Sequence, residues 1–178
     1  MLVFSLDSIN NADKKGDISM KVIIIYVSKY GCAEKCVKKL AEKLDGAVDL
    51  CNLKSENNVE IWHYDTVIIG GSIYMSSMQK EITAFCTQNE NALKEKKVAL
   101  FTCGMRDGSM AEEQLNNAFS KSLIEAAIAK ECFGGEFIFG KMKFIDRLIA
   151  KKVSGAKEDI SNILEENIDK LAQAVNTN

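Results

Sequence analysis

One short segment carries residue types that suit an anion. It stands between an apolar run and a pattern of helical period, and its residues are Ser28, Lys29, Tyr30, Gly31, Cys32 and Ala33. The backbone N–H groups at the start of a helix lack partners within the helix and carry partial positive charge, so a loop of small and hydroxyl-bearing residues there suits a phosphate. A turn that binds nothing explains the same residues, because every βαβ unit needs one. Position alone leaves both interpretations open.

Two further segments place glycines directly after apolar runs. Gly70 and Gly71 begin one of them, and Gly104 lies in the other. Glycine at a strand end allows a backbone geometry or a close ligand approach that a Cβ would prevent. We expect a flat, partly apolar group to lie between the two segments. The residues expected around it are Ser72, Ile73, Tyr74, Met75, Cys103, Gly104 and Met105.

These segments need a sheet whose strands end at one edge. Residues 22–27 are apolar at every position and mostly β-branched, which is typical of a strand buried on both faces of a parallel sheet. Similar strands are expected over 65–69 and 97–101. A shorter strand is expected over 47–50, and a fifth over 131–139, where two glycines weaken or bulge it.

Patterns of helical period separate the strands. They cover residues 32–44, 78–87, 111–130 and 158–175, and each places apolar residues on one face. A break of the third helix near residues 120–122 stays open. Five strands that alternate with helices predict an α/β domain with a doubly wound parallel sheet of order 2-1-3-4-5 and helices on both faces. In such a sheet the loops after strands one, three and four meet at the carboxyl edge, where ligands bind. The three segments are therefore expected to form one pocket.

The composition limits the class of protein and its partners. The chain has 178 residues, of which 47% are hydrophobic, enough for one domain with a substantial core. With 23 basic and 25 acidic residues and a net charge of -2, no overall field favours nucleic acid. No apolar run reaches the roughly 20 residues of a membrane span. We expect a soluble, cytoplasmic protein with one domain over 20–178 and a disordered N-terminal extension at 1–19, which is too weakly flanked for a signal peptide.

The cysteines form no CxxC pair, and we interpret them as reduced thiols. Cys32 and Cys36 stand four residues apart at the start of a helix, where they could form a reactive or metal-binding pair. The sequence shows no histidine or further cysteine nearby to complete a site. We therefore predict no metal centre.

The residues at three strand ends resemble those of the flavodoxin superfamily. The resemblance rests on residues 24–31, 70–74 and 101–105, and it extends over nearly everything from Met20 onward. In that superfamily the first loop holds the phosphate of FMN, and the loops after the third and fourth strands enclose the isoalloxazine ring. The resemblance therefore implies an FMN cofactor, with its phosphate on the first segment and its ring and ribityl chain between the other two.

One residue departs from the pattern of the superfamily. Threonine is usual where this chain has Ala33, so one hydroxyl donor to the phosphate is missing. Each lost hydrogen bond to a charged group weakens binding by about 1.5 to 3 kcal/mol unless another group replaces it. The resemblance thus implies a phosphate that depends on Ser28 and on backbone N–H groups.

A basic and apolar segment resembles one particular branch of the superfamily. Residues 144–155, together with 71–73, are similar to the short flavodoxin-domain branch that includes the quinone-linked protoporphyrinogen IX dehydrogenases. This similarity implies an FMN-dependent oxidoreductase of heme biosynthesis that passes electrons from protoporphyrinogen, or a related substrate, to a quinone. A helix start that covers the sheet explains the same segment without any substrate.

Two other functions stay open. A flavodoxin-type electron carrier would act on a redox partner protein and would need no small-molecule substrate. A doubly wound module without flavin would account for Ala33 with no further assumption. For the oxidoreductase, the apolar residues among the cations of 141–152 would provide an access route for a quinone or porphyrin and a peripheral contact with a membrane surface.

Overall fold

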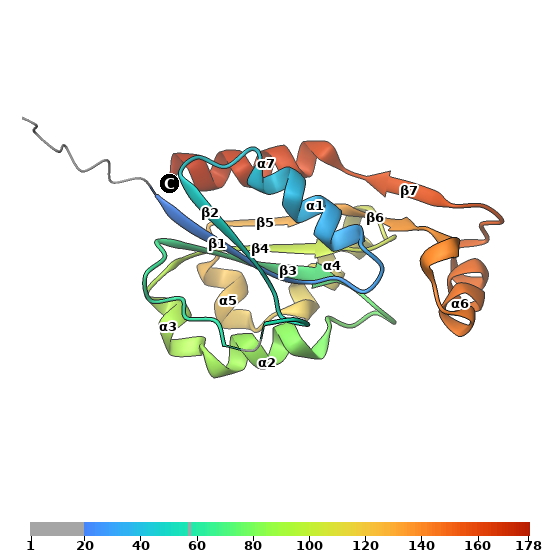
Figure 1. The fold of residues 1–178 in the computed structure, drawn as a ribbon, viewed down its shortest axis with the longest axis horizontal. Coiled ribbons are helices and arrows are strands. Elements are labelled where there is room, and N and C mark those ends of the chain that lie inside the picture. Colours follow the sequence, from blue (N-terminus) through green and yellow to red (C-terminus); the bar gives the residue numbers. More distant parts are fainter. Residues whose placement is uncertain (1–19, 57) are drawn as a thin grey trace, which may run out of the picture.

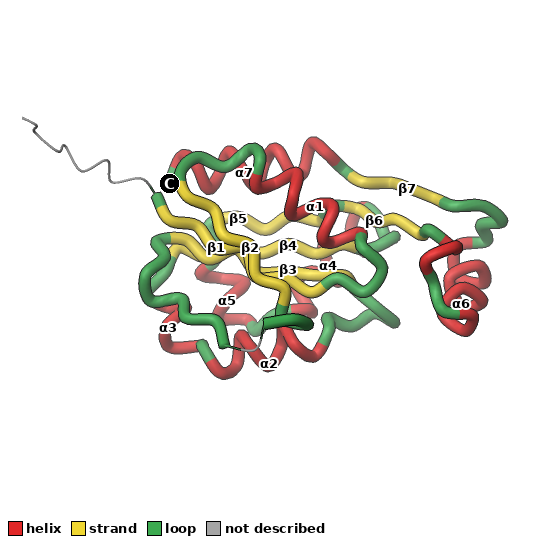
Figure 2. The backbone as a smooth tube through the Cα atoms, viewed as in Figure 1, coloured by secondary structure: helices red, strands yellow, loops and turns green. Residues whose placement is uncertain are grey.

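Five parallel strands form the central sheet of the computed structural model, which describes residues 20–56 and 58–178. In chain order they are β1 (Lys21–Val27), β2 (Ala47–Asn52), β3 (Thr66–Ser72), β4 (Lys97–Cys103) and β5 (Ala129–Cys132). The spatial order is β2-β1-β3-β4-β5, and each neighbouring pair is parallel (Figure 1, Figure 2). The predicted sheet and its order are confirmed. The extension expected at 1–19 lies outside the described residues.

Helices cover both faces of the sheet (Figure 1). One face carries α1 (Cys32–Ala41) and α7 (Glu165–Thr177). The other carries α2 (Lys80–Gln88), α3 (Glu90–Lys94), α5 (Lys121–Ala126) and the last residue of α4 (Gly108–Ala118). The predicted arrangement of helices on both faces is therefore confirmed.

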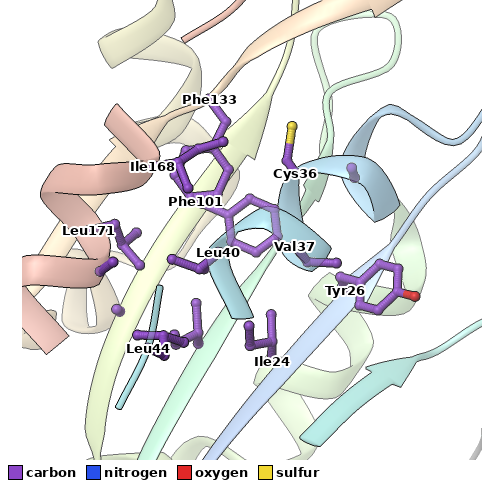
Figure 3. Packing of buried hydrophobic residues seen from close by; sticks show 14 of the residues in the cluster. Ile24, Tyr26, Cys36, Val37, Leu40, Leu44, Phe101, Phe133, Ile168 and Leu171 are labelled. Atoms are coloured by element: carbon purple, nitrogen blue, oxygen red, sulfur yellow. The ribbon is translucent and has the colours of Figure 1, made fainter. Parts of the chain in front are cut away.

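The strand β1 shows how the sequence builds both layers. Ile24 belongs to the hydrophobic cluster beneath α1 and α7, whereas its neighbours Ile23 and Ile25 belong to the cluster on the other face. Figure 3 shows part of the first cluster, in which Leu40 of α1 and Leu171 of α7 lie over one face of the central strands. A strand that is apolar at every position thus serves two cores at once.

The fifth predicted strand is divided in two. Only β5 joins the parallel sheet, and β6 (Gly134–Phe137) leaves it to pair antiparallel with β7 (Ile160–Ile163). Gly134 permits this change of direction, because its φ is +70° and a Cβ there would overlap the carbonyl oxygen of Asn162. The prediction of a helix over 158–175 is wrong at its start for the same reason. Residues 160–163 form β7, and α7 begins only at Glu165.

Two other helices differ in extent from the expected ranges. The break considered near residues 120–122 of the helix expected over 111–130 is present, because α4 ends at Ala118 and α5 begins at Lys121. Ser120 caps α5, since its Oγ accepts a hydrogen bond from the N–H of Leu123 at 3.4 Å. The helix expected over 32–44 ends at Ala41.

The chain between β6 and β7 projects past the carboxyl edge of the sheet. It contains the short 3-10 helix η1 (Phe139–Lys141) and the helix α6 (Phe144–Ser154). α6 lies to one side of the sheet and covers neither of its faces (Figure 1). The interpretation of this segment as a cover for the sheet is therefore wrong. Within the described residues, none of the helices has the length and apolar character needed to cross a bilayer.

Candidate functional site

A cavity of about 450 Å³ opens at the carboxyl edge of the sheet. Its walls come from the segments that follow β1, β3 and β4, and from β6 and α6. Cavities of roughly 300 to 1,000 Å³ hold small molecules and cofactors. The sequence-predicted residues that line it are Lys29, Tyr30, Cys32, Ser72, Ile73, Tyr74, Met75, Cys103, Gly104 and Met105. Ser28, Gly31 and Ala33 are not part of the lining.

The first segment makes a tight turn into α1. Gly31 has a left-handed φ of 94°, and its N–H donates to the Oγ of Ser28 at 3.1 Å. The carbonyl of Gly31 accepts from the N–H of Lys35 at 2.9 Å. Apart from its chain neighbours, no heavy atom lies within 4 Å of the place where a Gly31 Cβ would stand. The N-terminus of α1 therefore borders open space, whereas the methyl group of Ala33 is fully buried in the core.

The second segment closes into a tight turn beside the cavity. Tyr74 and Ser77 exchange two backbone hydrogen bonds, of 2.9 and 3.0 Å. Between them, Met75 and Ser76 have positive φ angles of 49° and 62°. Two consecutive residues in this region form the turn that suits a closed hairpin tip. The turn holds the side chain of Tyr74 at the cavity wall.

The third segment is held from two sides. The N–H of Ile73 donates to the carbonyl of Cys103 at 2.7 Å, and the N–H of Gly104 donates to the carbonyl of Gly134 at 2.8 Å. β6 approaches so closely that a Cβ on Gly135 would stand 2.7 Å from the backbone of Gly104. Only a glycine allows this contact. β6 is thus a wall of the cavity.

Asp146 of α6 joins the first and second segments. Its carboxylate accepts hydrogen bonds from the hydroxyls of Tyr30 and Tyr74, and it pairs with the Nζ of Lys29 at 2.9 Å. The Nζ of Lys29 also lies 3.4 Å from the centroid of the Tyr74 ring, in a cation–π contact. These partners, with the Tyr30 hydroxyl first, hold the pKa of Asp146 well below its usual range. The contacts tie α6 to the rim of the cavity.

Asp146→Asn is expected to lower stability in a pH-dependent way. Because the folded pKa of Asp146 is depressed, its carboxylate stabilises the native state fully above the ordinary value of about 3.9, and this stabilisation is lost as the pH falls toward the folded pKa. We expect a loss of about 1 kcal/mol near pH 7 that shrinks below about pH 4. Urea unfolding at several pH values measures it, with Glu158→Gln, at an exposed carboxylate, as control. A difference that persists unchanged at pH 3 would contradict the assignment.

Three thiols gather beside the cavity. The Sγ atoms of Cys32, Cys36 and Cys103 all lie within 4.8 Å of one another. Hydrogen bonds from Cys103 and Cys36 lower the pKa of the Cys32 thiol. Hydrogen bonds with Cys32 and Cys36, followed by burial, raise the pKa of the Cys103 thiol. The prediction of no metal centre relied on the lack of a further ligand near Cys32 and Cys36, and the fold brings one there from β4.

Sequence reasoning missed the cavity residues that β6 and α6 supply. Those residues are Gly135, Glu136, Phe137, Asp146, Ile149 and Ala150, to which the third segment and α4 add Arg106 and Gln114, and the second segment adds Ser76. Met142, one of the apolar residues expected along an access route, also lines the cavity, between η1 and α6. The cations and apolar residues of 141–152 drew attention to α6 but not to its carboxylate. Adjacent glycines at 134 and 135 were the available signal that the chain turns there. That signal does not reveal where the returning strand lies.

Solved structures share this fold at low sequence identity. Flavodoxin 2 from Bacillus cereus is 22% identical with a TM-score of 0.57, and the match covers 87% of this chain and 97% of that one. A short-chain flavodoxin associated with a bacterial microcompartment is 14% identical with a TM-score of 0.56, covering 88% and 96%. The Flv1 flavodiiron core from Synechocystis is 20% identical with a TM-score of 0.55, covering 89% and 36%. This chain therefore spans about a third of that flavodiiron chain.

The sequence itself matches one family over most of its length. No curated protein sequence matches the chain. A family model described as a flavodoxin domain matches residues 23–163. That range runs from within β1 to the end of β7 and includes every residue that lines the cavity. The chain belongs to the flavodoxin-domain family.

Proposed function

We propose that the protein is a flavoprotein that binds FMN and transfers electrons. The observation that carries this proposal is the convergence of three glycine-bearing segments on one cavity beside the N-terminus of α1. When bound, FMN supplies the redox chemistry by accepting and donating one or two electrons, so no side chain has to act as a nucleophile. The residues of the protein would bind the cofactor, orient it and exclude water.

The first segment fits the phosphate of FMN. Gly31 leaves open space at the start of a ten-residue helix, whose first N–H groups carry partial positive charge. Lys29 adds a cation at the cavity wall, and the Oγ of Ser28 holds the turn. Because the side chain of Ala33 is buried, we assign phosphate binding at Cys32 and Ala33 to backbone groups.

The space between the second and third segments fits the flavin ring. Tyr74 offers an aromatic surface there, and aromatic pairs contribute about 0.5 to 1.5 kcal/mol beyond the area they bury. A Cβ on Gly104 would stand 3.6 Å from Ile73, in ordinary van der Waals contact, so the glycine leaves that small volume open. We assign the ring and ribityl chain to the residues of these two segments.

For the reaction, we propose that a cytoplasmic enzyme oxidises protoporphyrinogen IX or a related apolar substrate with a quinone acceptor, at a membrane surface. The support is α6. Phe144 and Ile145 are 67% and 69% exposed among the cations of 141–152, a combination that suits a membrane interface. Met142 and Ile149 line the cavity, so the same segment leads from the exposed surface to the site.

An electron carrier is the second candidate. A carrier needs an exposed edge beside its flavin on which a redox partner protein can dock. Met75 favours this function, because its side chain lines the cavity and is 72% exposed. Such a carrier would need no small-molecule substrate and no access route along α6.

A flavin titration tests the proposed cofactor. Freshly purified protein is expected to show flavin absorption, and added FMN is expected to raise the melting temperature, since a ligand that binds only the native state stabilises it. Riboflavin, which lacks the phosphate, is the control and should give a smaller shift. Colourless protein whose melting temperature does not change when FMN is added would contradict the proposal.

An assay with protoporphyrinogen and menaquinone, run on the FMN-bound protein, separates the two functions. Porphyrin fluorescence reports the rate, and a rate no higher than background would favour the electron carrier.

A further inference from the structure

Cys32, Cys36 and Cys103 form a compact group of sulfur ligands that extends from the cavity wall into the core. Cys32 and Cys36 stand one turn apart on α1, and Cys103 is the last residue of β4. Their Sγ atoms lie within 4.8 Å of one another, and the three residues are 8%, 0% and 2% exposed. Two elements far apart in the sequence therefore bury three thiols at one point, where their sulfur atoms can contact the same ion.

We propose that these three cysteines bind one soft divalent metal ion, of the kind represented by Zn²⁺, through three sulfur atoms. Zinc–sulfur bonds are about 2.3 Å long, which places three sulfurs around one ion about 4 Å apart. The thiols therefore have to close by less than about 1 Å, a movement that side-chain rotation supplies. The backbone of α1 and β4 need not move.

The chemistry of the ligands selects the class of ion. Thiolates favour soft or borderline ions over Mg²⁺ or Ca²⁺, which take oxygen ligands. A site of three thiolates and a divalent ion has a net charge of about −1, whereas the same site with a monovalent ion has a net charge of about −2. Burial penalises the larger charge. The nearby charges of Lys35 and Glu136 offset each other, because the two side chains pair at 2.8 Å. The divalent ion is therefore the better fit.

The position of the group leaves one side of the ion accessible. Within the part of the chain that the structure describes, the group contains no fourth histidine, cysteine or carboxylate ligand. Cys32 and Cys103 also line the cavity, so a fourth position would face it. Binding replaces each S–H bond by a metal–sulfur bond and releases that proton to solvent, with no change of oxidation state.

Zinc titration by calorimetry tests the site. Protein reduced with a phosphine is expected to bind one Zn²⁺, and Cys36→Ser and Cys103→Ser are each expected to weaken binding at least 100-fold. Cys86→Ser and Cys51→Ser remove buried thiols from the other face of the sheet and should leave binding unchanged. Binding that survives the first two substitutions, or that fails in the last two, would overturn the proposal.

X-ray absorption at the zinc edge keeps the test independent of whether the variants fold. Zinc-loaded wild-type protein is expected to show about three sulfur neighbours near 2.3 Å. A first shell of nitrogen and oxygen atoms alone would overturn the proposal. Both measurements are made with and without FMN, and neither reads a flavin signal, so failure of the metal site is distinguishable from failure of the proposed function.

Discussion

Gly31→Asp is expected to weaken FMN binding by about 100-fold and to leave riboflavin binding unchanged. The new carboxylate would enter the open space at the N-terminus of α1, where we assign the phosphate. Two like charges about 5 Å apart repel each other by roughly 3 kcal/mol at an effective dielectric constant of about 20, and each 1.4 kcal/mol is a factor of ten in affinity. Calorimetric titration with each flavin measures the effect.

Gly31→Asn is the matched control for this substitution. Asparagine and aspartate both tolerate the left-handed backbone better than other side chains, so they share the backbone cost of a φ of 94°. Because asparagine is neutral and of the same shape, its affinity for FMN is expected to stay within about tenfold of wild type. Equal losses for the two variants, or an equal loss of riboflavin binding, would mean that the shape of the turn was disturbed rather than a phosphate site.

Gly134→Ala is expected to cost about 2 to 4 kcal/mol of folding stability. Its φ of +70° disfavours any side chain, and the added Cβ would overlap the carbonyl oxygen of Asn162. The substitution therefore combines a strained backbone with a steric overlap at the start of the β6–β7 pair. Urea unfolding gives the free energy directly.

Gly140→Ala controls for the loss of a glycine in the same part of the chain. Apart from its chain neighbours, no atom lies within 4 Å of the Cβ position of Gly140, and its φ is outside the left-handed region. We expect its free energy of unfolding to stay within about 0.5 kcal/mol of wild type. If Gly134→Ala behaved like this control, β7 with its Asn162 would have to shift freely away from residue 134, and the antiparallel pair could not be the fixed wall that we describe.

The parallel sheet and its pocket could be predicted because they follow from local patterns. Residues 22–27 are apolar throughout, and a strand of that kind has to be buried on both faces. Once such strands alternate with helices, right-handed crossovers and the carboxyl-edge rule bring the three glycine-bearing segments together. No long-range pairing has to be guessed. The lining by Tyr74 and Gly104 follows from strand order alone.

The walls built by β6 and α6 could not be predicted, because they depend on contacts between distant residues. Phe137 pairs with Ile160, and nothing in either short strand specifies the partner. Asp146 is bound to Tyr30 and Tyr74 across more than 70 residues of chain. The third thiol beside Cys32 and Cys36 was hidden for the same reason, since only the packing of α1 against β4 brings Cys103 there.

The antiparallel pairing of Phe137 with Ile160 also bears on how the domain can evolve. Because these residues are neighbours, the intervening chain leaves and returns at one place. Insertions, deletions or replacements within that stretch can therefore alter what reaches the cavity without redirecting any strand of the parallel sheet. Related proteins can therefore change the reaction that they carry out while keeping the same parallel sheet.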